Sequence, residues 1–308
     1  MSVTDKFRWL MTRLSGGFVL AFHEINPERL SEFVEYFWPA RPVPLSELVE
    51  RSKNGKSTSS LFAITIDDGV GENVRNLARL FLQKSWPATF YLPTRYLETG
   101  EGMVFQWWRL VKPLLPAARL ELTSGVIDLS HPGSLERLSR VMETAWHTER
   151  LESYYRTTMD LAAIATRGRR ELRPPAPVSW SEVQTLSRTG LIQFESHAVS
   201  HVAMSALTRE ELVSEMQHSR DLVSEHTGQI CRHLAYPFGS PQSVGSLAVD
   251  VASRFYDSAT TMSLGGVDHT HPWLLPRIPL YPENSNLLAR SKVLVKCSTP
   301  KRFSWRSH

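Results

Sequence analysis

The feature that most constrains the fold is a series of short apolar runs separated by segments with helical periodicity. Each run is about six residues long. The runs are FVLAFH (18–23), LFAITI (61–66), ATFYLP (88–93), LIQFES (191–196), HLAYPF (233–238), FYDSAT (255–260) and PRIPLY (276–281). Segments that are apolar on both sides are typical of parallel strands covered by helices.

The segments between these runs carry apolar residues at helical spacing. After the first run, Leu30, Phe33, Val34 and Phe37 follow the i, i+3, i+4, i+7 pattern of an amphipathic helix. Alternation of strand and helix, repeated about seven times, predicts the α/β class and a closed or nearly closed (β/α) barrel of about seven parallel strands.

One stretch, from about 100 to 176, interrupts the alternation. It contains a tryptophan pair, a hairpin pattern over 119–129 and two helical segments. We interpret it as a helical and hairpin insertion within a single domain that spans 1–308. A basic C-terminal tail is expected from about 290.

The net charge of +4 is small for 308 residues and gives no reason to expect a nucleic-acid partner. The N-terminal segment lacks the apolar centre of a signal peptide, so a cytoplasmic location is the default expectation. Five apolar residues there could form an interfacial helix with weak affinity for the inner membrane face, or pack on the protein: Phe7, Trp9, Leu10, Met11 and Leu14. The oligomeric state is left open.

Two aspartates, Asp67 and Asp68, end the second run in the sequence ITIDDG. Sites in parallel α/β proteins form at the carboxyl ends of strands, and Gly69 permits a tight turn there. Successive strand residues point to opposite sides, so the two acids can take different roles. Alone the signal is weak, because aspartates at strand ends are often turn formers or helix caps.

The sequence HAVSH follows another of the runs and places His197 and His201 four residues apart. Two imidazoles and one carboxylate from a strand end would form a three-ligand metal site with a coordination position open for water. Zn²⁺ is the preferred ion. Co²⁺, Ni²⁺ and Mn²⁺ also suit these ligand types.

These motifs resemble a known family. ITIDDG and HAVSH resemble the first two motifs of the polysaccharide deacetylases (carbohydrate esterase family 4, the nodulation-type chitooligosaccharide deacetylase homology domain), and LAYPFG (234–239) resembles a variant of the third. The resemblance extends over about residues 18–281. It implies a distorted (β/α) barrel and metal-dependent removal of acetyl groups from sugars.

The resemblance also implies roles for individual residues. Asp67 would be the general base, and Asp68, His197 and His201 would hold the metal, whose bound water attacks the acetyl carbonyl. The backbone amide of Phe238 would help to bind the negative oxygen of the intermediate.

Two departures from the family pattern affect the catalytic assignments. The third motif often carries an arginine that orients the catalytic aspartate, and Ala235 occupies that place. Arg277, in LPRIPL, could replace it or could be a surface arginine. The expected late histidine motif for the general acid is not found. His23 at the end of the first run is the first candidate, followed by His269 and His271.

Four aromatic residues are assigned to substrate binding. Tyr236 and Phe238 belong to the third motif, and Trp107 and Trp108 begin the insertion. Aromatic rings cover the apolar faces of pyranose sugars. Core packing is the alternative for each tryptophan.

The expected activity is deacetylation of an N-acetylated sugar in a polysaccharide, an oligosaccharide or a lipid-linked glycan precursor, such as an intermediate of exopolysaccharide assembly. Two alternatives remain open. One is an O-acetyl esterase or another C–N amide hydrolase on the same fold. The other is an inactive carbohydrate-binding protein, which the substitution at Ala235 and the unassigned general acid would fit.

Overall fold

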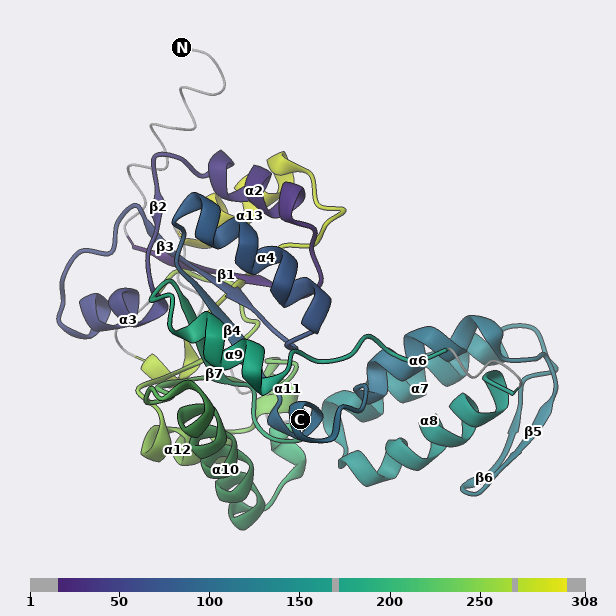
Figure 1. Ribbon diagram of the computed structural model, residues 1–308. Helices are drawn as coiled ribbons and strands as arrows, with labels where there is room; N and C mark the ends of the chain where they lie inside the picture. Colours follow the sequence, from purple (N-terminus) through teal and green to yellow (C-terminus); the bar gives the residue numbers. More distant parts are fainter. Residues whose placement is uncertain (1–15, 168–171, 268–270, 298–308) are drawn as a thin grey trace.

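A computed structural model describes residues 16–167, 172–267 and 271–297. Its main element is one curled parallel sheet in the order β10-β1-β3-β4-β7-β8-β9, with the short β2 paired to β3 (Figure 1). The strands are β1 (Phe18–Phe22), β2 (Arg41–Pro42), β3 (Leu61–Ile66), β4 (Ala88–Leu92), β7 (Ile192–Ser196), β8 (His233–Ala235), β9 (Ser258–Thr260) and β10 (Ile278–Pro279).

The seven strands in this order come from the seven apolar runs, so the predicted barrel strands are confirmed. Every residue of β1 and β3 is buried, because helices cover the outer face and side chains fill the interior. The two strands run in register from Phe18 beside Phe62 to Phe22 beside Ile66. The paired β2 is an addition that the apolar pattern did not predict.

The sheet curls until its two edges are joined by one segment. Thr260, at the end of β9, bridges in parallel to Leu275. Further along the same segment, Ile278 pairs with Leu20 of β1. The residues around β10 therefore link both edges, and the predicted distorted (β/α) barrel is confirmed.

Helices surround the barrel, and several begin at caps that the sequence encodes. Ser179 and Glu182 form a capping box at the start of α9, and Thr208 and Glu211 form another at α10. The surrounding helices are α2 (Pro27–Tyr36), α3 (Leu45–Lys53), α4 (Gly71–Lys84), α5 (Thr94–Thr99), α9 (Trp180–Ser187), α10 (Arg209–Thr227), α11 (Pro241–Val244), α12 (Ser246–Phe255) and α13 (Asn286–Cys297).

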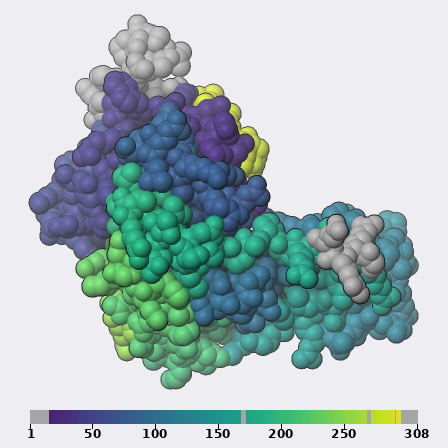
Figure 2. All heavy atoms as spheres, in the orientation of Figure 1, coloured from purple at the N-terminus to yellow at the C-terminus, as the bar shows by residue number. Residues whose placement is uncertain are grey.

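The stretch predicted to be an insertion forms an arm that projects from the barrel (Figures 1 and 2). It consists of α6 (Val104–Val111), the hairpin β5 (Arg119–Leu122) and β6 (Gly125–Asp128), α7 (Ser134–Thr148) and α8 (Leu151–Ala165). The arm has an apolar cluster of its own, which includes Trp108 and Leu161 and extends to Val202 in a barrel loop.

The C-terminal part of the described chain is helical where a basic tail was expected. Within α13, Lys292 donates hydrogen bonds from Nζ to the Pro279 carbonyl and to Asn284 Oδ1, both at 2.9 Å. Residues 298–308 and the proposed interfacial segment at 7–14 lie outside the described residues. No helix in the described ranges is both long enough and apolar enough to cross a membrane.

Candidate active site

The chain turns sharply where β3 ends. The Asp67 N–H still donates to the Phe22 carbonyl of β1 (2.9 Å), and the Gly69 N–H donates back to the Asp67 carbonyl (3.0 Å). Asp68 and Gly69 both have left-handed φ angles, 71° and 60°. A Cβ atom at position 69 would lie 2.8 Å from Leu92 Cδ2, so glycine is needed there. The turn presents both carboxylates at the carboxyl end of the sheet.

Asp67 is buried and held by Arg277. The guanidinium donates from Nη1 to Asp67 Oδ1 (2.7 Å) and from Nη2 to Asp67 Oδ2 (2.8 Å). Burial alone would raise the pKa of Asp67, but Arg277, with His197 and His23, holds that pKa well below its usual range. Asp67 is therefore ionised and fixed in one orientation.

Arg277 contacts Asp67 as predicted, and the alternative of a surface arginine is excluded. Its side chain is 0% exposed, and Nε donates to the Thr261 carbonyl at 3.2 Å. Ala235, which stands where the family motif often carries arginine, is buried in β8. The counterion of Asp67 is thus supplied by the segment beside β10 instead of by the third motif.

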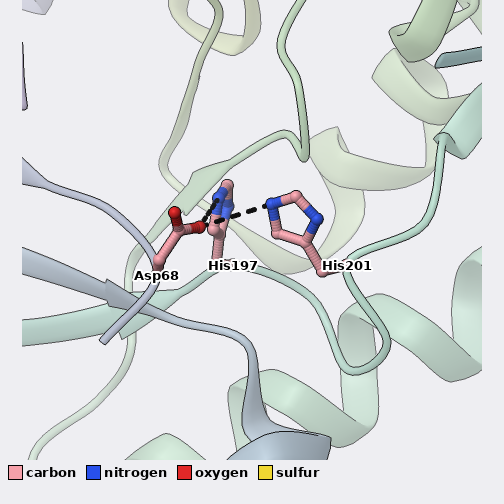
Figure 3. A group of neighbouring side chains, drawn as sticks. All are labelled: Asp68, His197 and His201. Carbon is pink, nitrogen blue, oxygen red and sulfur yellow. Dashed lines mark ion pairs between the residues drawn. The ribbon is translucent and has the colours of Figure 1, made fainter. Parts of the chain in front are cut away.

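The side chains of Asp68, His197 and His201 converge (Figure 3). Asp67 lies beside them, with its Oδ2 4.0 Å from His197 Nε2. Asp68 Oδ1 lies 3.5 Å from His201 Nε2 and 3.8 Å from His197 Nε2. One possible ligand atom from each residue lies within 4.8 Å of the other two, and all three side chains are buried. Ligands around a tetrahedral Zn²⁺ are separated by about 3.3 Å, so the spacing is close to that of a metal site.

The chemistry of these donors also fits a cation. Asp68 Oδ1 is buried and has no hydrogen-bond partner among the described residues, which would be costly without an ion. The carbonyl of Ala235 accepts a hydrogen bond from His197 Nδ1 (2.7 Å), which leaves Nε2 with its lone pair free. Burial lowers the pKa of His197 to about 4 and that of His201 to about 3. Both rings are neutral at pH 7, as metal binding requires.

The loop from His197 to His201 is fixed by hydrogen bonds from two helices. Glu215 of α10 accepts the backbone N–H groups of Val199 and Ser200 at Oε2, both at 2.9 Å. The Tyr96 hydroxyl of α5 donates to the Ser200 carbonyl at 3.1 Å. His201 itself has a left-handed φ of 51°. The loop is therefore a clamped turn, and its clamp orients the second imidazole.

His23 also lies at the site. It directly follows β1, and its Nε2 is 3.8 Å from Asp67 Oδ2, with 38% of the side chain exposed. It is thus close to the Asp67 carboxylate and partly exposed at the surface. His269 lies outside the described residues, and His271 is an exposed residue ahead of a short 3-10 helix.

A family model for polysaccharide deacetylases matches residues 54–254. The chain belongs to the polysaccharide deacetylase family. As a family member it is a hydrolase of carbon–nitrogen bonds, and its activity is the deacetylation of sugars. Among curated proteins, no sequence matched.

Solved structures with this fold include two deacetylases and the protein IcaB. The Streptococcus pyogenes deacetylase PplD, in complex with acetate, is 13% identical over 88% of this chain and 95% of its own, with a TM-score of 0.57. IcaB from Ammonifex degensii is 12% identical over 92% and 98% (TM-score 0.57). A de-N-acetylase from Aggregatibacter actinomycetemcomitans is 13% identical over 90% and 99% (TM-score 0.57).

The structure corrects two of the predicted substrate-binding residues of this deacetylase. Trp108 is 2% exposed and packs in the apolar cluster of the arm. Tyr236 is 0% exposed, and its hydroxyl donates to the Trp273 carbonyl at 3.1 Å. Neither side chain is available to a sugar. Trp107 is partly buried and packs against the arm cluster, so its role in substrate binding stays a prediction.

Phe238 lies at the candidate metal site. Its φ is 61°, and its partly exposed ring meets the His201 ring edge-on, with the centroids 4.8 Å apart. Gly239 follows, where a Cβ atom would lie 2.6 Å from the Met262 nitrogen. This tight turn brings the third motif against His201, one of the candidate metal ligands.

Three residues near the site were missed by the sequence reasoning: Glu215, Phe105 and His147. The Phe105 ring lies 5.2 Å from the His201 ring, and the His147 ring lies 4.6 Å from the Phe238 ring, centroid to centroid. Phe105 lies two residues before Trp107 in the same stretch, but no local pattern connects any of the three residues with the family motifs.

Proposed function

We propose that this chain removes acetyl groups from N-acetylated sugars of a polysaccharide, an oligosaccharide or a lipid-linked glycan precursor, in a metal-dependent reaction. The observation that best supports this proposal is the position of Asp67. This carboxylate is ionised, is hydrogen-bonded to Arg277 and lies beside the three candidate metal ligands, with its Oδ2 4.0 Å from His197 Nε2. The similar de-N-acetylase supports an N-acetyl substrate over an O-acetyl ester.

Asp68, His197 and His201 would hold the divalent ion, with Zn²⁺ as the first candidate. When bound, such an ion polarises the acetyl carbonyl and makes water more acidic. Asp67 lies beside these ligands with both oxygens hydrogen-bonded to Arg277. Since Asp68 is assigned to the metal, Asp67 is the carboxylate that is available for proton transfer.

The residues of the chain then divide the reaction between them. Asp67 accepts a proton from the water as the water oxygen adds to the carbonyl carbon. The Phe238 amide stabilises the negative carbonyl oxygen. The C–N bond breaks as His23 donates a proton to the nitrogen, which leaves as the free amine while acetate is released. Because His23 Nε2 and Asp67 Oδ2 are 3.8 Å apart, the proposed acid and the proposed base can reach the same acetyl group.

The test is acetate release from a panel of N- and O-acetylated sugars, with chelated protein and after addition of Zn²⁺. We expect release from N-acetylated sugars only in the metal-loaded protein. Asp67→Asn should lower kcat roughly 10²- to 10⁴-fold. Asp221→Asn, which changes an exposed carboxylate on α10, is the matched control and should keep full activity.

Full acetate release by Asp67→Asn would exclude the proposed base. Release from O-acetylated sugars alone would favour the esterase alternative. Sugar binding without any release by the metal-loaded protein would favour an inactive carbohydrate-binding protein.

A further inference from the structure

The arm contacts the mouth of the barrel at two places near the proposed catalytic residues. Arg109 of α6 forms an ion pair with Glu24, the residue after His23, at 3.4 Å. His147 of α7 contacts the ring of Phe238. Two helices of the inserted segment therefore reach the site, although the arm extends away from the barrel (Figure 1).

Three partly exposed rings are connected to the imidazole of His201, two of them by direct contact. Phe238 and Phe105 both contact it, with centroid distances of 4.8 and 5.2 Å. The ring of His147 adjoins Phe238, with centroids 4.6 Å apart and planes inclined by 55°. None of the three is fully buried. Two of these rings, Phe105 and His147, come from the arm and one from the barrel.

This set of rings has the chemistry of a sugar-binding wall. Phenylalanine faces cover the apolar C–H surface of a pyranose. Imidazole nitrogens can exchange hydrogen bonds with hydroxyl groups. Within the described part of the chain, no hydrogen bond or ion pair engages either ring nitrogen of His147, while burial lowers its pKa and favours the neutral ring.

We propose that the arm forms one wall of the substrate site, in which Phe105 and His147 bind a sugar residue of an oligosaccharide next to the one that is deacetylated. This inference rests on the proposed function. It makes Phe105 and His147 specificity-determining residues: a polymer substrate reaches them, and a single N-acetylated sugar seated at the metal leaves them without a neighbouring residue to bind.

Turnover gives the first test. We compare kcat/KM for tetra-N-acetylchitotetraose and for N-acetylglucosamine in the metal-loaded wild type, His147→Ala, His147→Asn and Phe105→Ala. Loss of a sugar contact should lower the tetramer-to-monomer ratio roughly tenfold in the two alanine variants. The effect should appear mainly in KM for the tetramer. His147→Asn should recover part of the ratio, because an amide can replace a ring N–H.

His131→Ala is the matched control, because it changes a histidine of the same arm that is 73% exposed. It should leave the ratio unchanged. Circular dichroism and metal titration of each variant separate a binding role from a packing role. A packing role would change the thermal midpoint or metal affinity without changing the ratio between the two substrates.

Binding without turnover gives the second test. Calorimetric titration of tetra-N-acetylchitotetraose into metal-loaded Asp67→Asn, with and without His147→Ala or Phe105→Ala, should show roughly tenfold weaker binding in each double variant. Equal Kd values in Asp67→Asn and in the double variants would contradict sugar binding by Phe105 and His147, whether or not the wild type releases acetate. Weaker binding in the double variants, together with no acetate release by the wild type, would contradict the proposed function but support sugar binding by Phe105 and His147.

Discussion

Arg277 supplies a buried counterion to Asp67 from a segment 210 positions along the chain. The pairing followed from the resemblance and not from spacing, because no local pattern connects residues so far apart. The strand-end acids and the two histidines were predictable, since each lies in a short motif at a strand end. The burial of Tyr236 and Trp108 was not, because exposure depends on packing that only the assembled fold determines.

Replacement of Arg277 is expected to reduce activity and stability. Arg277→Lys keeps a positive charge but loses the paired hydrogen bonds to both Asp67 oxygens, so we expect kcat to fall roughly 10- to 100-fold. Arg277→Met leaves a buried carboxylate without a partner and should cost about 3–5 kcal/mol in the free energy of unfolding. Steady-state assays and urea denaturation measure the two effects.

The control for Arg277 is another arginine–aspartate pair. Arg232 and Asp257 lie 3.0 Å apart with 51% and 50% of their side chains exposed. Arg232→Met should change stability by no more than about 1 kcal/mol. Similar losses at both sites would contradict the assignment of a special role to the buried pair.

His233 makes stability depend on pH. The ring is 2% exposed, and burial lowers its pKa to about 4 from an ordinary value of 6.5. Below pH 6.5 the unfolded chain binds the proton more readily, so this contribution to stability is lost as pH falls from 6.5 towards 4. The slope from this group approaches about 1.4 kcal/mol per pH unit.

Replacement of His233 tests that slope. Urea denaturation of metal-free protein between pH 4.5 and 7.5 should show a shallower pH dependence in His233→Asn than in the wild type. His131→Asn, at the exposed arm position, should keep the wild-type slope. An unchanged slope in His233→Asn would show that the buried ring is not the source.

At the scale of elements, the site depends on the helices whose side chains hold the loop between His197 and His201 in place. Glu215 lies on α10, whose start was recognisable from the capping box at Thr208 and Glu211. Its contact with the loop was not recognisable, because a glutamate on an amphipathic helix is usually solvated. The apolar runs predicted strand positions well, whereas the contacts between helices and loops depend on how the layers pack.

Loss of the Glu215 clamp is expected to weaken metal binding. Glu215→Ala removes the acceptor for the Val199 and Ser200 N–H groups, and we expect Zn²⁺ affinity to fall roughly 10- to 100-fold. Glu215→Gln keeps one acceptor oxygen and should lose less. Competition with a chromophoric chelator measures the affinity, and Glu225→Ala at the far end of the same helix is the control. Equal affinity in Glu215→Ala and the wild type would exclude the clamp.

At the scale of the whole molecule, the barrel was predictable from the alternation of strands and helices, while the arm was recognisable mainly as an interruption. Its direction and its contacts with the barrel mouth follow from two apolar clusters that meet at the loop after His201. Val202 and Leu207 of that loop contact the arm cluster. Sequence periodicity identifies the faces of helices but not the partner against which each face packs.

The separate core of the arm predicts local unfolding. Leu161 is 0% exposed in the arm cluster, and Leu161→Ala should destabilise the arm by about 2–5 kcal/mol. Limited proteolysis should then cleave within 100–176 while the barrel stays intact. Leu77→Ala, at an equally buried position of the barrel, should increase cleavage throughout the protein. A uniform cleavage pattern in Leu161→Ala would show that the arm and barrel unfold together.

The strand order has a consequence for the chain as it leaves the ribosome. β1 and β3 emerge early, but the outer edge of β1 pairs with β10, and the counterion of Asp67 sits directly before that strand. Until residues 277–279 emerge, the nascent barrel has an open edge and an uncompensated carboxylate. The motifs with Asp67 and Asp68 and with His197 and His201 have already been translated by then. The onset of activity is therefore set by the docking of β10.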